Sequence, residues 1–255
     1  MPYDADSLER RDPDLIRRLL PIAEAFNRHY VRLDVSGTEH IPRTPCLYVG
    51  NHNGGISGPD LVCTLGTLWK TLGVEHPLYA LAHDFAMRQL KPFGSLLQRG
   101  GGISARHHNA ERVFARGGQV LVYPGGELDA FRHYKKRHDV VLLPRTGFAR
   151  LALKSNVPIV PVVASGAHDS MIIITEGKRI AWLLDLPRRA RVCTFPIALA
   201  LPWGVAIGPW LPYLPLPFQV KLRFLPPMRA EDDETPRAFA MRVEAAMRTT
   251  MRALA

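Results

Sequence analysis

The sequence predicts an α/β fold: a single domain with a mixed, largely parallel sheet that is flanked by helices. Three observations support this prediction. Short runs rich in β-branched and apolar residues alternate with runs of helical periodicity, which is the pattern of a sheet with helical connections. The 255 residues, 47% of them hydrophobic, suffice for one sizeable core. No internal repeat, low-complexity tract or linker divides the sequence.

An N-terminal amphipathic helix is expected within residues 1–34. Asp12 and Pro13 form a typical helix start, in which a capping side chain precedes a proline in the first turn. Apolar residues then recur at helical spacing on one face. Either the rest of the domain or the lipid of a membrane interface covers this face, and both interpretations stay open. The face consists of Leu15, Ile16, Leu19, Leu20, Ala23 and Phe26.

The main domain is expected at residues 35–230, where strands and helices alternate. Short β-rich runs predict strands at 46–49, 78–81, 119–123 and 157–162. Helical spacing of apolar residues predicts helices at 61–72, 84–90, 109–115 and 148–154. A C-terminal helix at about 236–254 closes the chain, within residues 231–255.

The turn after the first strand holds the most informative residue, His52. It lies in a glycine-rich stretch, residues 51–60, that leads into the helix-like run. Such a turn places its side chains at the carboxyl edge of a sheet, where open α/β folds carry out their chemistry. Histidine accepts a proton near neutral pH, and a carboxylate such as Asp60 can fix its tautomer. His52 is therefore a candidate for activating a hydroxyl, although a lone pair of this kind is more often structural.

A second turn of the same kind, residues 124–127 (Pro-Gly-Gly-Glu), follows the strand at 119–123. Together the two turns resemble the glycerolipid acyltransferase superfamily, the lysophosphatidate acyltransferase-like enzymes, in the branch with Asn-His-x-Gly-Gly and Tyr-Pro-Gly-Gly blocks. Residues 145–152 and 157–169 look like the third and fourth blocks of that superfamily. The resemblance covers roughly residues 47–228, and four blocks in the expected order make it specific.

Two positions depart from the superfamily's commonest blocks. Ser57 stands where the first block most often carries an aspartate, and the first downstream carboxylate is Asp60. Gly125 stands where the second block most often carries a glutamate, and Glu127 follows two residues later. The assignment of His52 is unchanged, and Asp60 is the first candidate for the carboxylate that supports it, with Glu127 the next.

The resemblance implies transfer of a fatty acyl group from an acyl thioester to the hydroxyl of a glycerolipid or lysophospholipid acceptor. His52 would be the general base and Asp60 its orienting carboxylate. The co-substrate would be acyl-CoA or acyl-carrier protein, and no further cofactor is expected. The three cysteines are widely spaced, so neither a disulfide framework nor a metal site is expected.

Backbone N–H groups of both turns are expected to stabilise the tetrahedral oxyanion of this reaction. The candidates are Gly54 and Gly55 in the first turn and Gly125 and Gly126 in the second. Glu127 would orient the acceptor hydroxyl or pair with an arginine.

Phosphate groups of the substrates require a cationic partner. Arg99 and Arg106 flank glycines 100–102, in the region where the family carries a phosphate-binding arginine, and Arg132 is a third candidate. For each arginine, a solvated surface position is the plain alternative.

Two other functions are weighed against acyl transfer. A serine-type lipid hydrolase would need a Gly-x-Ser-x-Gly elbow, and neither Ser57 nor Ser165 has that spacing. A non-catalytic lipid-binding protein on the same fold would account for the departures at Ser57 and Gly125. Acyl transfer that depends on His52 would distinguish the enzyme from both.

A formal net charge of +10 favours anionic partners, and no nucleic-acid-binding signature accompanies it.

Residues 192–220 carry no charge and contain six prolines, which prevent a regular transmembrane helix. This stretch is either an apolar loop packed over the sheet or an interfacial flap through which acyl chains reach the site. No secretory signal peptide is expected, because residues 1–12 are charged and polar. A peripheral protein on the cytoplasmic face of an anionic membrane is expected.

Overall fold

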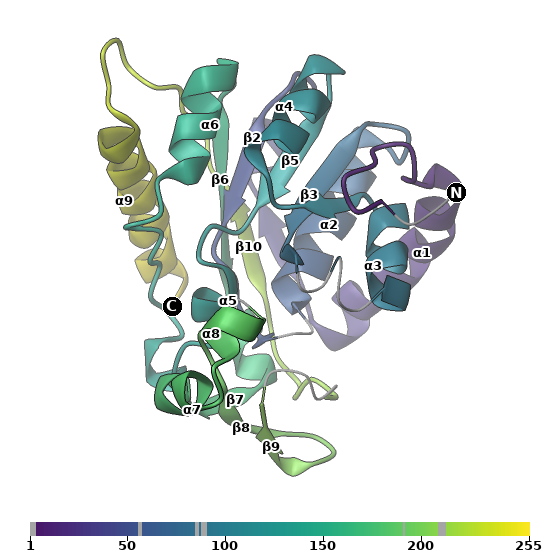
Figure 1. Ribbon diagram of the computed structural model, residues 1–255. Helices are drawn as coiled ribbons and strands as arrows, with labels where there is room; N and C mark the ends of the chain where they lie inside the picture. Colours follow the sequence, from purple (N-terminus) through teal and green to yellow (C-terminus); the bar gives the residue numbers. More distant parts are fainter. Residues whose placement is uncertain (1–3, 56–57, 85–86, 88–90, 191, 209–212) are drawn as a thin grey trace.

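The computed structural model describes residues 4–55, 58–84, 87, 91–190, 192–208 and 213–255. Within these residues the main sheet has seven strands in the order β1-β10-β6-β2-β5-β3-β4 (Figure 1). The five strands from β6 to β4 are parallel to one another, and β10 is antiparallel to β6. The predicted mixed, largely parallel sheet is therefore confirmed. In spatial order the strands are β1 Asp34–Ser36, β10 Lys221–Phe224, β6 Ile159–Ser165, β2 Leu47–Gly50, β5 Gln119–Val122, β3 Leu78–Ala82 and β4 Gly102–Ser104.

Alternation along the central strand β2 explains why helices cover both faces of the sheet. Leu47 and Val49 point into one core, which α4 (His107–Ala115), α6 (Gly147–Ser155) and α9 (Pro236–Leu254) cover. Tyr48 points into the other core, which α2 (Pro59–Leu72) covers. Each fully buried side chain of this size contributes about 1.5–3 kcal/mol to the free energy of unfolding.

The N-terminal helix α1 (Pro13–Ala25) begins as the sequence predicts. The side chain of Asp12 accepts a hydrogen bond from the backbone N–H of Leu15, and Pro13 occupies the first turn. The helix packs beside α2 and α3 (Lys91–Arg99) and buries Ile16, whereas Leu19 and Ile22 stay exposed. Of the two interpretations of this face, packing on the domain accounts for Ile16.

The predicted helix at 84–90 falls mostly outside the described residues, which include only Asp84 and Met87 of that range. Helix α3 and strand β4, which follow it, were not predicted from the sequence. Shorter helical turns complete the description of this domain: η1 Phe26–Tyr30, η2 Thr38–His40, α5 Gly126–Ala130, η5 Tyr134–Lys136 and η6 Ala167–Ser170.

Residues 192–220, which were expected to be an apolar loop or an interfacial flap, contribute two strands to a small antiparallel sheet. Its strands are β7 (Ile172–Thr175), β8 (Ile197–Ala200) and β9 (Gly204–Ile207), and β8 and β9 form a hairpin. The proline-free runs between Pro196, Pro202 and Pro209 are long enough for short strands, which is why the prolines did not prevent regular structure. Two short helices, α7 (Lys178–Leu183) and α8 (Leu186–Arg189), lie between β7 and β8. None of the described helices combines the length and hydropathy that crossing a bilayer requires.

Candidate active site

Three turns meet at the carboxyl edge of the three adjacent parallel strands β6, β2 and β5. Residues 51–55 follow β2, residues 123–132 follow β5, and η6 follows β6. In a parallel sheet the carboxyl ends of neighbouring strands lie about 5 Å apart, so their turns come into contact. This edge is where open α/β folds place their ligands.

His52 and Asp60 are brought together at this edge. Nδ1 of His52 lies 2.9 Å from Oδ2 and 3.2 Å from Oδ1 of Asp60. Asp60 is the second residue of α2 and is fully buried, while the side chain of His52 is 22% exposed. Because an ionised carboxylate only accepts hydrogen bonds, Nδ1 carries the proton and Nε2 carries the lone pair. The hydrogen bonds that the ring makes to described residues all involve Nδ1, so Nε2 can receive a substrate hydroxyl.

The environment of His52 favours its protonated form. Burial lowers the pKa of the ring, but the charge of Asp60 and the hydrogen bond to it outweigh burial. The carboxylate of Asp129 adds to this effect, and the pKa of His52 is raised above its ordinary value. The ring is therefore a stronger base than a solvated histidine, and the carboxylate of Asp60 stabilises its charged form.

Asparagine side chains hold the backbone on either side of His52. The amide of Asn51 accepts a hydrogen bond from the backbone N–H of Ala164 and donates one to its carbonyl, each at 2.9 Å. The amide of Asn53 donates to the same carbonyl at 3.1 Å. The turn after β2 is thereby attached to the end of β6.

Tyr123 stacks on the ring of His52. Their ring centroids are 4.8 Å apart and the planes differ by 28°. Gly50 makes this arrangement possible, because a Cβ atom there would lie 2.4 Å from Cε1 of Tyr123. Stacking of this kind restricts the rotamer of His52 and complements the bond to Asp60.

Asp129, which was not predicted from the sequence, binds the backbone of the catalytic turn. Its Oδ2 accepts a hydrogen bond of 2.6 Å from the N–H of His52, and its Oδ1 accepts one from Arg132. Gly125 leaves the room, since a Cβ atom there would lie 2.3 Å from Cβ of Asp129. That glycine is the one signal in the sequence that could have indicated a side chain packed on the second turn.

Arg132 has a structural role rather than the phosphate-binding role for which it was a candidate. It is buried and forms an ion pair with Asp129. Its guanidinium also donates to the carbonyls of His52 and Lys136 and to the side chain of Asn53. These partners occupy the guanidinium, so it is not available to a phosphate.

His168, from the fourth block, completes the network and was not assigned a role from the sequence. Nε2 lies 2.8 Å from the carbonyl of Arg132, and Nδ1 accepts a hydrogen bond of 3.4 Å from the N–H of Gly54. Burial, followed by the charge of Arg132, lowers the pKa of His168 to about 3. This histidine is therefore neutral at physiological pH, with its proton on Nε2.

The four glycines that were predicted as oxyanion donors differ in their availability. The N–H of Gly54 is bound to His168, and the N–H of Gly126 is bound to the carbonyl of Tyr123 at 3.1 Å. No hydrogen bond among the described residues occupies the N–H of Gly55 or Gly125. These two remain candidates for the oxyanion site.

Glu127 bonds away from His52. Its Oε1 accepts a hydrogen bond of 2.6 Å from the backbone N–H of Cys193, which joins α5 to the start of the apolar stretch. Of the two serines considered for a hydrolase, Ser57 lies outside the described residues. Ser165 is buried within β6, in register with Lys221 of β10.

Arg99 and Arg106 lie at opposite ends of strand β4, Arg99 at the amino end and Arg106 at the carboxyl end. Arg99 ends α3 before β4 begins, and it forms an ion pair of 2.7 Å with Asp12. Arg106 follows the end of β4, at the edge that carries His52, and its side chain is half exposed, 3.7 Å from Asp6. Strand β4 is three positions from β2, which separates the two turns by about 14 Å. Arg106 is therefore the better placed of the two to bind a phosphate of a substrate held at His52.

Comparisons with known proteins show which family the sequence matches. A sequence model of the Acyltransferase family matches residues 32–165. An uncharacterized protein of Mycobacterium tuberculosis is 29% identical over an alignment of 217 residues, which covers 83% of this chain and 56% of that protein. Diacylglycerol O-acyltransferase 2 of Homo sapiens is 24% identical over an alignment of 168 residues, which covers 62% of this chain and 42% of that protein. The chain thus spans about half the length of the curated relatives it matches.

A solved structure shares the fold. The 1-acyl-sn-glycerophosphate (LPA) acyltransferase of Thermotoga maritima aligns with a TM-score of 0.56 at 16% sequence identity. The alignment covers 96% of this chain and 84% of that one, so the likeness extends over nearly the whole described fold.

Proposed function

This chain belongs to the acyltransferase family, and we propose that it transfers a fatty acyl group from an acyl thioester to the hydroxyl of a glycerolipid or lysophospholipid. The hydrogen bond between Nδ1 of His52 and Asp60 carries this proposal. It leaves a basic Nε2 beside a partly exposed face, with a buried carboxylate behind the ring to stabilise the imidazolium.

The reaction proceeds in two steps, the addition of the hydroxyl to the thioester carbonyl carbon and the loss of the thiolate from that carbon. Nε2 of His52 takes the proton of the acceptor hydroxyl while its oxygen attacks the thioester carbonyl. The carbonyl oxygen becomes an oxyanion, for which the N–H groups of Gly55 or Gly125 are the proposed donors. The C–S bond then breaks, and the thiolate that leaves takes the proton from the imidazolium. The ester and the free thiol are the products, and the steps use only the groups named and the two substrates.

Two related proteins suggest the class of acceptor. One relative is named a diacylglycerol acyltransferase, and the structural neighbour is named a lysophosphatidate acyltransferase. Diacylglycerol and lysophosphatidate both present a hydroxyl group next to apolar acyl chain. We assign Arg106 to a phosphate, either that of a phosphorylated acceptor or one of the phosphates of CoA.

The test is a panel of acceptors with radiolabelled acyl-CoA or acyl-carrier protein. Lysophosphatidate, other lysophospholipids, diacylglycerol and a long-chain alcohol are each incubated with wild type and with His52→Ala. Labelled ester that forms with wild type and not with the variant supports the proposal. Hydrolysis without transfer, together with a trapped acyl-enzyme, would show a serine-type hydrolase. Lipid binding with no turnover of any pair would show a non-catalytic protein.

A further inference from the structure

The small sheet has two faces of different character. Ala198, Ala200 and Ala206 are buried against a cluster that includes Phe131 and Tyr213, at the carboxyl edge of the main sheet. The residues that alternate with them point outward and are large and apolar. On this outer face Ile174, Leu199, Leu201, Val205 and Ile207 are each between 41% and 55% exposed.

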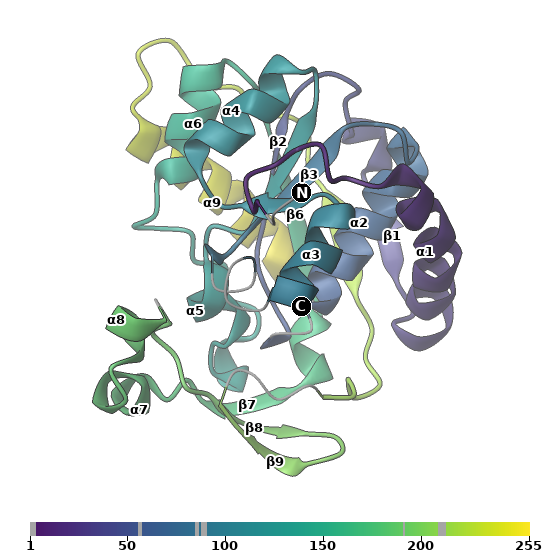
Figure 2. The ribbon, with the colours of Figure 1, turned by 45° about the vertical axis from the view of Figure 1, so that its right-hand side comes forward.

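The neighbouring helix α7 carries further exposed apolar side chains. Trp182 and Leu183 are each 75% exposed, and Leu184 follows them at 47%. The start of α7 is attached to the small sheet, because the N–H of Phe195 donates to the carbonyl of Glu176 at 3.0 Å. Both views of the molecule place α7, α8 and the small sheet together at one end (Figures 1 and 2). We call residues 172–190 and 192–207 the apolar lobe.

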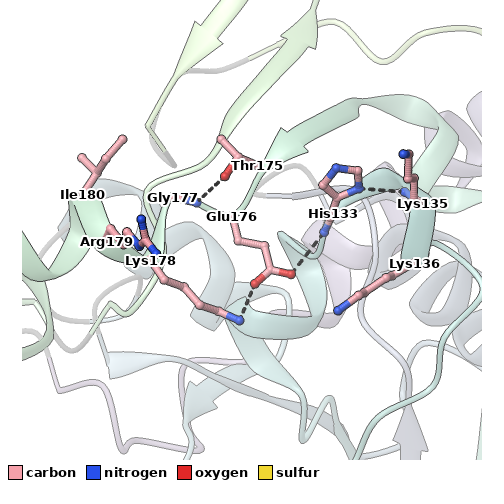
Figure 3. Close-up of a pocket in the computed structure, with 9 residues that line it drawn as sticks. All are labelled: His133, Lys135, Lys136, Thr175, Glu176, Gly177, Lys178, Arg179 and Ile180. Atoms are coloured by element: carbon pink, nitrogen blue, oxygen red, sulfur yellow. Dashed lines mark hydrogen bonds and ion pairs between the residues drawn. The ribbon is translucent and has the colours of Figure 1, made fainter.

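A basic cleft of about 730 Å³ lies between residues 175–180 of the apolar lobe and residues 133–136 of the main domain. Its lining includes Lys135, Lys136, Lys178 and Arg179, all exposed at the surface, and one acidic residue, Glu176. Figure 3 shows Lys136 and Lys178 extending from opposite walls toward Glu176, which forms an ion pair with Lys178. Cations therefore outnumber carboxylates in the lining of the cleft. Helix α8, also part of the apolar lobe, adds Arg188 and Arg189.

We propose that the apolar lobe docks on an anionic phospholipid bilayer, with its outer apolar side chains among the lipids and the cations of the cleft at headgroup phosphates. Exposed apolar side chains bordered by lysine and arginine are typical of surfaces that lie in a membrane interface. Tryptophans such as Trp182 and Trp203 favour the depth of the headgroups. This inference rests on the proposed function, since a glycerolipid acceptor resides in a bilayer.

Charge favours a bilayer over a second copy of the chain as the occupant. A symmetric dimer through the lobe would bring each basic cleft near its own copy, and like charges oppose such an interface. An anionic membrane neutralises the same cations and attracts them from a distance.

Docking through the apolar lobe would also place the catalytic turn close to the lipid. The inner face of the lobe packs on Phe131, Met171 and Tyr213. These three residues contact that turn: the hydroxyl of Tyr213 donates to the carbonyl of Gly54, and Met171 and Phe131 pack on Gly55.

The experiment is flotation of the full chain with vesicles of phosphatidylcholine alone or mixed with phosphatidylglycerol. Two lobe variants, Trp182→Ser/Leu183→Ser and Val205→Ser/Ile207→Ser, are compared with Leu19→Ser/Ile22→Ser. The last pair is a matched control, because those side chains of α1 are also exposed and apolar. Circular dichroism confirms that each variant is folded.

We expect wild type to bind the anionic vesicles, more weakly at high salt but still measurably, because salt does not screen the apolar part. Each lobe variant should lower the partition coefficient by about tenfold or more, and the α1 control should leave it nearly unchanged. The double variant Lys136→Gln/Arg179→Gln should weaken binding to the anionic vesicles and should leave binding to vesicles of phosphatidylcholine unchanged.

Three results would overturn the proposal: lobe variants that bind like wild type, a loss of binding confined to the α1 control, or a dimer without lipid that the lobe variants dissociate. His52→Ala separates the docking surface from the proposed chemistry. It should float like wild type even if no acyl transfer is found. Conversely, the lobe variants should keep wild-type turnover of water-soluble short-chain substrates.

Discussion

Asp60 binds His52 and the residue that follows it with the same oxygen atom. Its Oδ2 lies 2.9 Å from Nδ1 of His52 and 2.9 Å from the backbone N of Asn53. The carboxylate thus orients the ring and fixes the backbone that carries it. Because Asp60 is buried in the first turn of α2, where the helix dipole favours a negative charge, it stays in place when the ring gains a proton.

Replacement of His52 by alanine should lower kcat by about 10² to 10⁴-fold, the usual contribution of a general base. The fold should be retained, since Asp129 binds the backbone of residue 52 rather than its side chain. Steady-state kinetics and thermal unfolding measure the two effects. His107→Ala, an exposed histidine at the start of α4, is the control. Wild-type turnover by a folded His52→Ala protein would rule out the mechanism.

Asp60→Asn should change the pH dependence of the reaction. A general base must be unprotonated to act, so the rate rises as pH passes the pKa of His52. Asp60 raises that pKa, and removing its charge should move the midpoint of the acidic limb to lower pH. The loss in kcat should not exceed that of His52→Ala. Measured profiles of kcat/KM decide this, with Glu127→Gln as control. If the limb moved only in the control, Glu127 would be the supporting carboxylate.

Arg132→Met should destabilise the protein strongly. It removes the cation that pairs with buried Asp129, and loss of one partner of a buried ion pair costs about 3–5 kcal/mol in the free energy of unfolding. Urea unfolding monitored by circular dichroism measures this change. Arg116→Ala breaks an exposed ion pair with Glu9 and should change stability by about 1 kcal/mol or less. Similar values for the two variants would contradict the structural role of Arg132.

Arg106→Ala should raise KM for the phosphate-bearing substrate by about 10- to 100-fold, the contribution of a charge-assisted hydrogen bond. Arg99→Ala should leave KM nearly unchanged, because Arg99 lies at the opposite edge of the sheet and pairs with Asp12. KM values for acceptor and donor, determined separately, show which substrate carries the phosphate. Equal effects of the two variants would contradict the assignment.

Features with local signals were predictable from the sequence. Asp12 and Pro13 predicted the start of α1, and the spacing of apolar residues predicted α9 over its whole length. The glycine-rich turn predicted that His52 lies at the carboxyl edge of the sheet. Asp60, the first acidic residue after His52, was predicted as its partner and forms a hydrogen bond with it. In each case the residues that determine the structure are close together in the chain.

Features that depend on distant segments were missed. Asp129 reads as a surface acid of a short helix, and its burial follows from the adjacency of β2 and β5. Strand β10 has only four residues, and its position is determined by antiparallel pairing with β6. The hairpin of β8 and β9 was hidden among prolines, since two strands of four residues carry little periodicity of their own.

The side chain of Asn51 stands in for backbone where the central strand ends. Its amide offers one donor and one acceptor, the same pair that a peptide group would present to Ala164. The main chain of residues 51–53 is thereby released from the sheet without leaving the end of β6 unpaired. An aspartate differs from asparagine by hardly more than one atom, but it has no N–H to offer the carbonyl of Ala164. Spontaneous deamidation of this one side chain would therefore leave that carbonyl with the amide of Asn53 as its side-chain donor, and it would weaken the attachment of the catalytic turn to the end of β6.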